Sequence, residues 1–146
     1  MLLKLRQRMA REESGFTLVE LLVVMLILGL LAAIAIPSFF NQRDKARDAE
    51  AKSAVRTAQT SMETYSTDHQ GTYAGATPAD LVAIESTLND VGARLSVTST
   101  ATTYTVTVAS TNTPNTFSIT RAASGLTTLT CANAGNDGCP ANGQWG

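Results

Sequence analysis

The chain has 146 residues, a formal net charge of −1 and a hydrophobic content of 44%. This length permits one small domain with an appendage, and it excludes a large enzyme and a membrane protein with several spans. The small net charge gives no overall basic field, so no direct nucleic-acid site is evident. One His and two Cys leave few ligands for a metal or thiol site, and we expect neither a metal nor a cofactor.

The first fifteen residues, 1–15, form a short basic segment in front of a long apolar run. Its positive charges come from Lys4, Arg6, Arg8 and Arg11. A basic flank of this kind stays in the cytoplasm, while the chain beyond the apolar run is translocated. The sixteen residues 21–36 contain no charged side chain. The whole segment 16–40 is long enough to span a bilayer of about 30 Å.

Three interpretations of this front end compete. An ordinary secretory signal would be cut after small residues, and Ala33-Ile34-Ala35 fits such a cleavage site. A plain membrane anchor would keep the whole segment. The third interpretation cuts the chain between Gly15 and Phe16 and keeps the apolar run as structure.

Glu20 helps to choose among them, because it is the only charged residue between Phe16 and Phe40. A carboxylate inside a bilayer costs about 2.5–3.5 kcal/mol at mid-depth, which a signal or an anchor has no reason to accept. If the chain began at Phe16, Glu20 could pair with the new α-amino group of another copy and so set the register of an assembly. Alternatively, Glu20 lies at the membrane interface and favours the helix N-terminus.

The segment Gly15-Phe16-Thr17-Leu18-Val19-Glu20, behind a basic leader, resembles the processing signature of type IV prepilins. Pro37 also stands where that family has a helix-kinking proline. The resemblance implies that a prepilin peptidase cuts after Gly15 and then N-methylates Phe16. It also implies that the helix kinks, or loses hydrogen bonds in a filament, between Gly29 and Pro37.

Beyond Asn41 the pattern becomes one-sided. Apolar side chains recur every three or four residues at Ala51, Ala54, Val55, Ala58, Met62 and Tyr65. This spacing predicts an amphipathic continuation, 41–67, of one helix that starts at Phe16 and is about 75 Å long. We interpret the charged side chains as its solvated face: Asp44, Lys45, Arg47, Asp48, Glu50, Lys52 and Arg56. Asp48 and Lys52 have the spacing of a stabilising pair.

The segment 68–93 reads as a loop and a short helix. Asp68-His69-Gln70-Gly71 ends the long helix, and His69 is expected on the loop surface. Thr77 before Pro78 predicts the start of the short helix. Its apolar face is expected to carry Leu81, Ile84 and Leu88.

From residue 94 to 146 apolar and polar residues alternate. The alternating apolar positions are Leu95 and Val97, then Tyr104, Val106 and Val108, then Phe117 and Ile119, and less cleanly Leu126 and Leu129. This predicts about four short antiparallel strands, packed on the apolar stripe of the helix. The expected fold class is therefore α+β and pilin-like, with the apolar half of the long helix projecting.

Cys131 and Cys139 enclose a loop rich in Gly and Asn. In a translocated domain the pair is expected to form a disulfide that pins the C-terminal loop. Asp137 offers a single carboxylate there, too few for a calcium site. Trp145 is expected either to pack on this loop or to be exposed.

No nucleophile with a base, no phosphate loop and no metal cluster is recognisable, so we expect no enzyme. The preferred function is a structural subunit of a type IV pilus, which polymerises through its N-terminal helix into a surface filament for twitching, adhesion or DNA uptake. Its partners would be copies of itself, the prepilin peptidase, an inner-membrane assembly platform, a cytoplasmic ATPase and membrane lipid. It would begin as a single-pass cytoplasmic-membrane protein and end in an extracellular filament. Alternatives are a pseudopilin of a type II secretion system and a secreted or membrane-anchored binding module.

Overall fold

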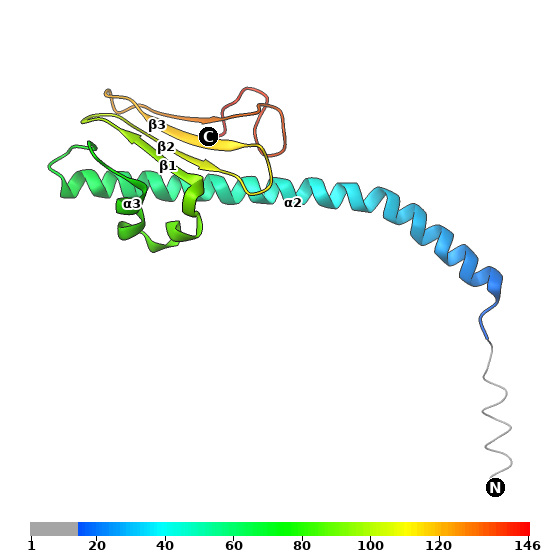
Figure 1. The fold of residues 1–146 in the computed structure, drawn as a ribbon. Helices are drawn as coiled ribbons and strands as arrows, with labels where there is room; N and C mark the ends of the chain where they lie inside the picture. The colour runs from blue at the N-terminus through cyan, green and yellow to red at the C-terminus, as the bar shows by residue number, and fades with distance from the viewer. Residues whose placement is uncertain (1–14) are drawn as a thin grey trace, which may run out of the picture. The chain divides into compact units, whose positions relative to one another are not determined.

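The computed structural model describes residues 15–146, so the expected leader lies outside the described residues except for Gly15. Two helices, α2 (Leu18–Asp68) and α3 (Pro78–Ile84), are followed by the 3₁₀ turns η1 (Ser86–Asp90) and η2 (Gly92–Arg94) (Figure 1). Four strands complete the chain: β1 (Leu95–Ser99), β2 (Tyr104–Ala109), β3 (Thr116–Arg121) and β4 (Thr127–Cys131). The chain divides into two compact units, Met1–Phe39 and Phe40–Gly146, and α2 contributes to both.

The second unit contains a four-stranded sheet in the order β1-β2-β3-β4, with every neighbouring pair antiparallel. This confirms the predicted sheet and the α+β class. The register places Val106 of β2 opposite both Val97 of β1 and Ile119 of β3. Because side chains alternate along a strand, this register gathers the apolar residues on one face of the sheet.

That apolar face and one stripe of α2 form the core. The helix contributes the buried side chains of Ala51, Val55, Ala58, Met62 and Tyr65, and the sheet contributes those of Tyr104, Val106, Val108, Phe117 and Ile119. The three- and four-residue spacing therefore predicted the buried stripe correctly. Alanine at two of its positions, Ala51 and Ala58, lets the sheet lie close to the helix backbone, while the larger sheet residues fill the space between them.

The opposite face of the sheet carries hydroxyl groups in two rows. Ser96, Thr107, Ser118 and Thr130 form one row, and Thr98, Thr105, Thr120 and Thr128 form the other. Neighbouring hydroxyls bond across strands, with Oγ1 of Thr105 and Oγ1 of Thr120 3.0 Å apart. These rows account for much of the Ser/Thr content of the region, because each strand alternates a hydroxyl residue with a core residue.

The ends of the helices differ slightly from prediction. α2 runs from Leu18 to Asp68 rather than from Phe16 to about Ser66. Gln70 (φ 59°) and Gly71 (φ 85°) then adopt left-handed backbone conformations, which end the helix. At α3, Thr77 and Asp80 form the reciprocal hydrogen bonds of a capping box. This confirms the helix start that was predicted from the position of Thr77 before Pro78.

The prediction that Ile84 lies on the buried face of the short helix, together with Leu81 and Leu88, is wrong. Glu85 has an extended backbone (φ −134°), so α3 stops at Ile84 and Leu88 belongs to the separate turn η1. Leu81 and Leu88 are buried, but Ile84 is 37% exposed. The helical spacing that related the three residues does not continue across Glu85.

Leu126 was also expected on a strand, and that prediction is wrong. It precedes β4, in the turn after β3, and is 66% exposed. Gly125 has φ 87° and donates its N–H to the carbonyl of Ala122, so a turn forms at this point. Alternation therefore resumes only at Leu129, which is partly buried against the core.

The largest correction concerns Asp48, which was expected on the solvated face of the helix. Its side chain is fully buried. The carboxylate accepts hydrogen bonds from Thr113 Oγ1 (2.7 Å), Asn115 Nδ2 (2.6 Å) and the backbone N–H of Gly138 (2.9 Å). The ends of the β2–β3 connection and the C-terminal loop are thereby fixed to α2. We call these four residues the Asp48 anchor.

Gly138 is required in the anchor for space. A Cβ atom at this position would lie 2.5 Å from the Cβ atom of Asp48. Lys52, one turn further along α2, donates from Nζ to the carbonyl oxygen of Gly138 at 2.6 Å. Among the described residues, Lys52 forms no ion pair with Asp48, so the expected helical pair is replaced by two separate contacts with one loop residue.

The C-terminal loop is closed by the disulfide between Cys131 and Cys139, whose Cα atoms are 5.8 Å apart. The tail then returns along β4: Cys131 N–H donates to the carbonyl of Gly143, and Trp145 N–H donates to that of Leu129. The indole N–H of Trp145 donates to the carbonyl of Thr130 at 2.8 Å, and the ring meets Phe117 edge-on. The tail therefore covers the outer edge of β4, which would otherwise be open to pairing.

We predict that Asp48→Ala lowers the free energy of unfolding by about 2–4 kcal/mol, because it leaves the donors of Asn115 and Gly138 unpaired. The measurement is denaturant unfolding of the full chain in detergent. Asp44→Ala is the matched control, since Asp44 makes only a partly exposed ion pair with Arg47. Equal stability of the two variants would contradict the anchoring role.

The same anchor predicts a pH dependence. Burial alone would raise the pKa of Asp48, but the surrounding hydrogen-bond donors outweigh it and hold that pKa below the ordinary value of 3.8. The stability that the charged carboxylate contributes is therefore complete above the unfolded-state pKa and is lost as the pH falls through the lower folded-state value. The stability difference between wild type and Asp48→Ala is expected to persist down to about pH 4 and to shrink below it.

We predict that Cys131→Ser lowers the free energy of unfolding by about 2–3 kcal/mol, as expected for opening a short disulfide loop. The far-ultraviolet circular dichroism of the helix should be retained, because the core of α2 and the sheet does not depend on the bridge. Reduction of the wild-type protein should give the same shift. Loss of most of the helical signal in either case would contradict this division of roles.

Candidate functional site

The residues expected to guide processing and assembly lie at the start of α2. Gly15, Phe16 and Glu20 are all exposed. The Glu20 carboxylate accepts, through Oε2, hydrogen bonds of 3.0 Å from both the backbone N–H and the hydroxyl of Thr17. Glu20 N–H donates in return to Thr17 Oγ1 at 3.2 Å. These contacts form a capping box at the helix N-terminus.

Thr17 is a site residue that sequence reasoning missed, although the pattern Thr-x-x-Glu just before an apolar helix is readable as a capping box. The box gives Glu20 a local role in a single chain, which corresponds to the helix-N-terminus alternative. It occupies only one carboxylate oxygen: among the described residues, Oε1 of Glu20 accepts no hydrogen bond. That oxygen is available to a donor from outside the chain.

The apolar segment that follows is exposed along almost its whole length. Its large side chains range from 46% exposed at Val23 to 81% at Phe16. By length and composition, α2 qualifies as one candidate membrane span near the N-terminus. The helix continues through Gly29 and Pro37. Pro37 has no N–H to donate within the helix, and a Cβ at Gly29 would meet nothing within 4 Å.

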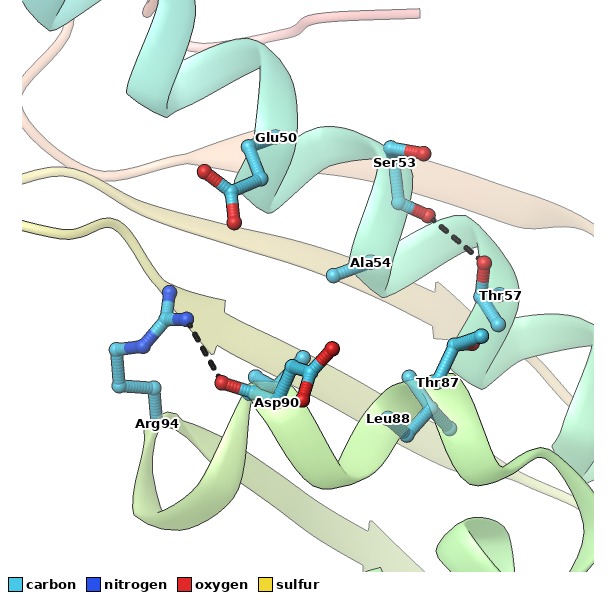
Figure 2. A pocket seen from close by; sticks show the side chains of 9 residues that line it. Glu50, Ser53, Ala54, Thr57, Thr87, Leu88, Asp90 and Arg94 are labelled. Carbon is cyan, nitrogen blue, oxygen red and sulfur yellow. Dashed lines mark hydrogen bonds between the residues drawn. The ribbon is translucent and has the colours of Figure 1, made fainter.

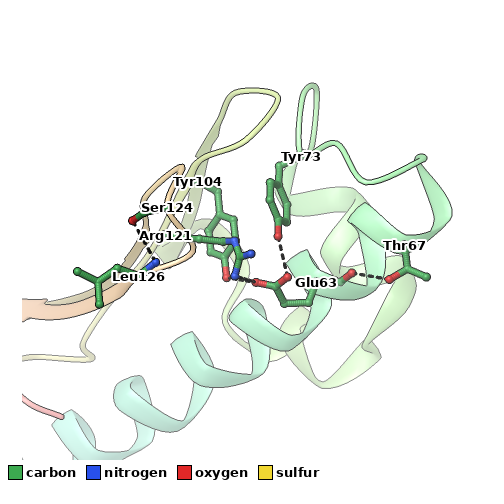
Figure 3. A network of polar contacts seen from close by, with 7 residues as sticks. All are labelled: Glu63, Thr67, Tyr73, Tyr104, Arg121, Ser124 and Leu126. Carbon is green, nitrogen blue, oxygen red and sulfur yellow. Dashed lines mark hydrogen bonds and ion pairs between the residues drawn. The ribbon is translucent and has the colours of Figure 1, made fainter.

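A polar network that the sequence did not reveal joins the far end of α2 to the sheet (Figure 3). Glu63 accepts hydrogen bonds from the hydroxyls of Tyr73 (2.7 Å) and Tyr104 (2.8 Å). Arg121 Nη1 lies 3.4 Å from Oε1 of the same carboxylate. The guanidinium carbon of Arg121 is also 5.6 Å from the centre of the Tyr73 ring.

The phenol groups of both tyrosines in this network have a raised pKa. Burial raises the pKa of Tyr104, and its hydrogen bond to the Glu63 carboxylate raises it further. The same two causes, burial first, raise the pKa of Tyr73. The phenols therefore act as fixed donors that tie three segments together, and neither is prepared to give up a proton in a reaction.

The isolated polar residues considered as sites are accounted for by local contacts. His69 is exposed, stacks on Tyr65 and has Nδ1 2.8 Å from the carbonyl oxygen of that residue. Asn133 donates to the carbonyl of Pro114, and Asn136 donates to that of Asn133. In residues 15–146, no group of three or more His, Cys, Asp or Glu side chains is placed to hold a metal ion.

A groove of about 190 Å³ lies between α2 and the turns η1 and η2 (Figure 2). Its sides carry the carboxylates of Glu50 and Asp90, and Figure 2 shows Ser53 and Thr57 along the helix wall. Arg94 also lines it, with hydrogen bonds to the carbonyls of Ala109 (3.0 Å) and Asp90 (3.4 Å). Among the residues that line it, no nucleophile is paired with a base.

Two family models match the chain and meet near Pro37. The prokaryotic N-terminal methylation motif matches residues 10–36. The model described as "Type IV minor pilin ComP, DNA uptake sequence receptor" matches residues 37–139. No solved structure gives a significant match.

Curated relatives match over part of their length. The type II secretion system core protein G of Pseudomonas aeruginosa is 37% identical over 59 residues, which cover 40% of this chain and 42% of that protein. The type IV major pilin protein PilA of Myxococcus xanthus is 39% identical over 37% of this chain and 24% of that protein. The competence protein ComGC of Halalkalibacterium halodurans is 35% identical over 40% and 57%, respectively. The chain therefore spans well under two thirds of each of these relatives.

The exposed apolar start of α2, the helix packed on a four-stranded sheet and the disulfide-closed loop agree with these matches. The second family model alone covers more than half of the chain. The family predicted from residues 1–45 is thus confirmed, and most of the second match lies beyond those residues. The chain belongs to the type IV pilin family, in the group of the minor pilin ComP.

Proposed function

We propose that the chain is a structural subunit of a type IV pilus, which polymerises through the N-terminal part of α2 into a surface filament. The observation that carries the proposal is the exposed apolar segment that begins at Phe16 and has Glu20 as its single charge. Members of this family are structural proteins, and the described residues offer no arrangement that would support an enzyme instead.

Processing would come first. A prepilin peptidase would remove the leader, 1–15, by cutting between Gly15 and Phe16 and would methylate the new amine. Gly15 is exposed, and no atom outside its neighbourhood in the chain lies within 4 Å of an added Cβ. The segment 16–40 would remain in the cytoplasmic membrane until assembly, with the rest of the chain translocated.

Assembly would exchange lipid for protein around this segment. Burial of apolar area is worth about 25 cal/mol per Å² when water is displaced, and much less when lipid already covers the surface. Apolar burial alone therefore does not select one axial position among many. Glu20 Oε1, which accepts no hydrogen bond within the described residues, would accept one from the Phe16 amine of a neighbour and fix the register.

Each of the remaining segments would have a separate structural role. Residues 41–67 hold the globular part on the helix, 68–93 cover its flank, and 94–146 form the surface sheet and the loop. Gly29 and Pro37 would allow a kink or a local loss of helical hydrogen bonds when the helices pack. Nothing in the described residues resembles a nucleotide site, so an inner-membrane platform and a cytoplasmic ATPase would supply the assembly energy.

A pseudopilin of a type II secretion system is the alternative within the family, because core protein G is among the relatives. The ComP-type model favours a pilus subunit, since it matches the globular part of the chain. The mature chain of a secreted binding module would start near Pro37. A membrane-anchored module would keep its leader. Mass spectrometry of the mature N-terminus separates these, since methylated Phe16 is expected only for a processed pilin or pseudopilin.

We predict that Glu20→Ala leaves processing intact but strongly lowers the amount of filament in sheared surface fractions, because the acceptor for the neighbouring amine is lost. Gly15→Val is the contrasting variant, which should accumulate uncut in the membrane. Filament yield is measured by electron microscopy and immunoblotting, and cleavage by mass spectrometry. Wild-type filament yield from Glu20→Ala would remove the register role.

DNA binding is a second candidate function, carried by the description of the family model that matches residues 37–139. The globular unit gives it limited electrostatic support. From residue 40 onward the sequence has seven Lys and Arg against nine Asp and Glu, a net charge of −2. Binding would therefore depend on local groups such as Lys45 and Arg56, which are exposed, rather than on the overall charge.

We predict that purified filaments bind a labelled DNA duplex and that their affinity falls steeply between 50 and 200 mM salt, as expected for contacts with phosphate groups. Arg56→Ala should reduce both the affinity and the slope against salt. The control is Arg94→Ala, because Arg94 is held by backbone carbonyls. Fluorescence anisotropy with purified filaments measures both quantities, and no binding at 50 mM salt would reject this function.

A further inference from the structure

Two surfaces on opposite sides of α2 in the second unit differ in charge. One is the groove of Figure 2, where Glu50 and Asp90 are exposed. Arg43 and Arg47 also lie on this side of the helix by their spacing, but neither lines the groove: Arg47 pairs with Asp44, and Arg43 lies over the Phe40 ring. The other flank carries Lys45, Lys52 and Arg56. Residues 50 and 52 differ by about 200° around a helix, so they project from nearly opposite sides. Spacings of seven and four place the three basic residues together on one side.

The groove has acidic groups without partners. Among the described residues, the carboxylates of Glu50 and Asp90 have no hydrogen bond or ion pair. Arg94 is the one cation among the residues that line the groove, and its guanidinium is bound to two backbone carbonyls. Two unpaired carboxylates against one engaged guanidinium leave the groove able to accept a further cation.

On the other side of α2, two of the basic side chains contact an aromatic ring. The guanidinium carbon of Arg56 lies 5.1 Å from the centre of the Trp145 ring, and Lys52 Nζ lies 6.0 Å from it. Arg56 and Lys45 are exposed, and neither makes an ion pair within the described part of the chain. The ring limits the positions that Arg56 can adopt without removing its charge or its donors.

These two surfaces face away from one another on α2, so one chain cannot pair them with itself. We propose that the acidic groove of one copy (Glu50, Ser53, Thr57 and Asp90) receives the exposed basic side chains Lys45 and Arg56 of the next copy, while Lys52 stays bound to Gly138 within its own chain. The inference rests on the proposed filament and names a contact between its globular units. The contact is heterologous, since each copy offers a different surface to each neighbour, and such contacts do not close unless a ring forms.

The groove suits a long cationic side chain better than a metal ion or a small anion. Two carboxylates supply fewer oxygen ligands than a calcium or magnesium ion takes. A small anion would meet both carboxylates. The hydroxyls of Ser53 and Thr57 could accept hydrogen bonds from a guanidinium, and the buried Leu88 at the base offers an apolar wall to its methylene stem.

Charge reversal tests the contact. Glu50→Arg, Asp90→Arg and Arg56→Glu should each reduce the yield of sheared filaments about tenfold or more, because like charges across an interface oppose association. The chain that carries both Glu50→Arg and Arg56→Glu restores an opposite-charge pair and should recover most of the yield. Asp68→Arg is the control, as it reverses an exposed acid at the end of α2 away from both surfaces.

A cross-link tests the geometry. With Glu50→Cys and Arg56→Cys in one chain, oxidised filaments should give a ladder of multimers on non-reducing gels, while each single variant gives dimers at most. The ladder is expected because every copy would bond to two different neighbours. Circular dichroism and thermal unfolding confirm that each variant keeps the fold.

The outcomes separate this contact from the filament itself. Wild-type yields from all three charge reversals, or a double variant no better than its parents, would overturn the contact while leaving the pilus subunit intact. Absence of a ladder from filaments that form normally would do the same. Absence of filaments from the wild-type chain, with correct processing, would instead overturn the proposed function.

Discussion

The N-terminal part of α2 carries apolar side chains on every side, and within residues 15–146 they are left largely uncovered. Such a surface is stable only in lipid or against other apolar surfaces. In the proposed function this segment would meet both environments in succession, first the membrane and then the packed helices of a filament. A helix that is apolar all round can slide along or rotate against its neighbours with little change in buried area. In the proposed filament, the polar groups that break this uniformity would therefore determine the axial position of each copy.

Glu20 is the first of these groups. In the single chain its carboxylate completes a capping box with Thr17, whose N–H and hydroxyl both donate hydrogen bonds to it. Within residues 15–146, its other oxygen, Oε1, accepts no hydrogen bond. The same residue can therefore stabilise the start of α2 before assembly and accept a neighbour's amine afterwards. The two interpretations of Glu20 are compatible, because they use different oxygen atoms.

The second half of α2 has a different task, which is to hold a small sheet and its loops. Small residues on the buried stripe allow close packing, and two polar clusters fix the sheet at separate points. Glu63 binds the tyrosines near one end, and Asp48 binds the β2–β3 connection and the C-terminal loop. With the sheet attached in this way, the unpaired charges fall on the two remaining flanks of the helix. Complementary flanks of this kind would give the globular units a register that agrees with the one set at Glu20.

The sequence by itself determined the features that depend on local periodicity. The apolar run, the three- and four-residue stripe from Ala51 to Tyr65 and the alternation in β2 and β3 each specify an element and its buried face. The processing motif predicted the family from residues that lie close together at the start of the sequence. These predictions succeeded because each depends on residues close together in the chain.

Only the tertiary structure decided the fate of individual polar residues. Asp48 looks like any other charge on an amphipathic helix, and its donors stand 65 to 90 residues further along the chain. Glu63 likewise has two partners, Tyr104 and Arg121, that only the sheet brings to it, beside the nearer Tyr73. Whether a carboxylate is solvated or buried depends on what packs above it, and no local pattern carries that information. The opposite charges of the two flanks also became visible only when the sheet showed which side of α2 it covers.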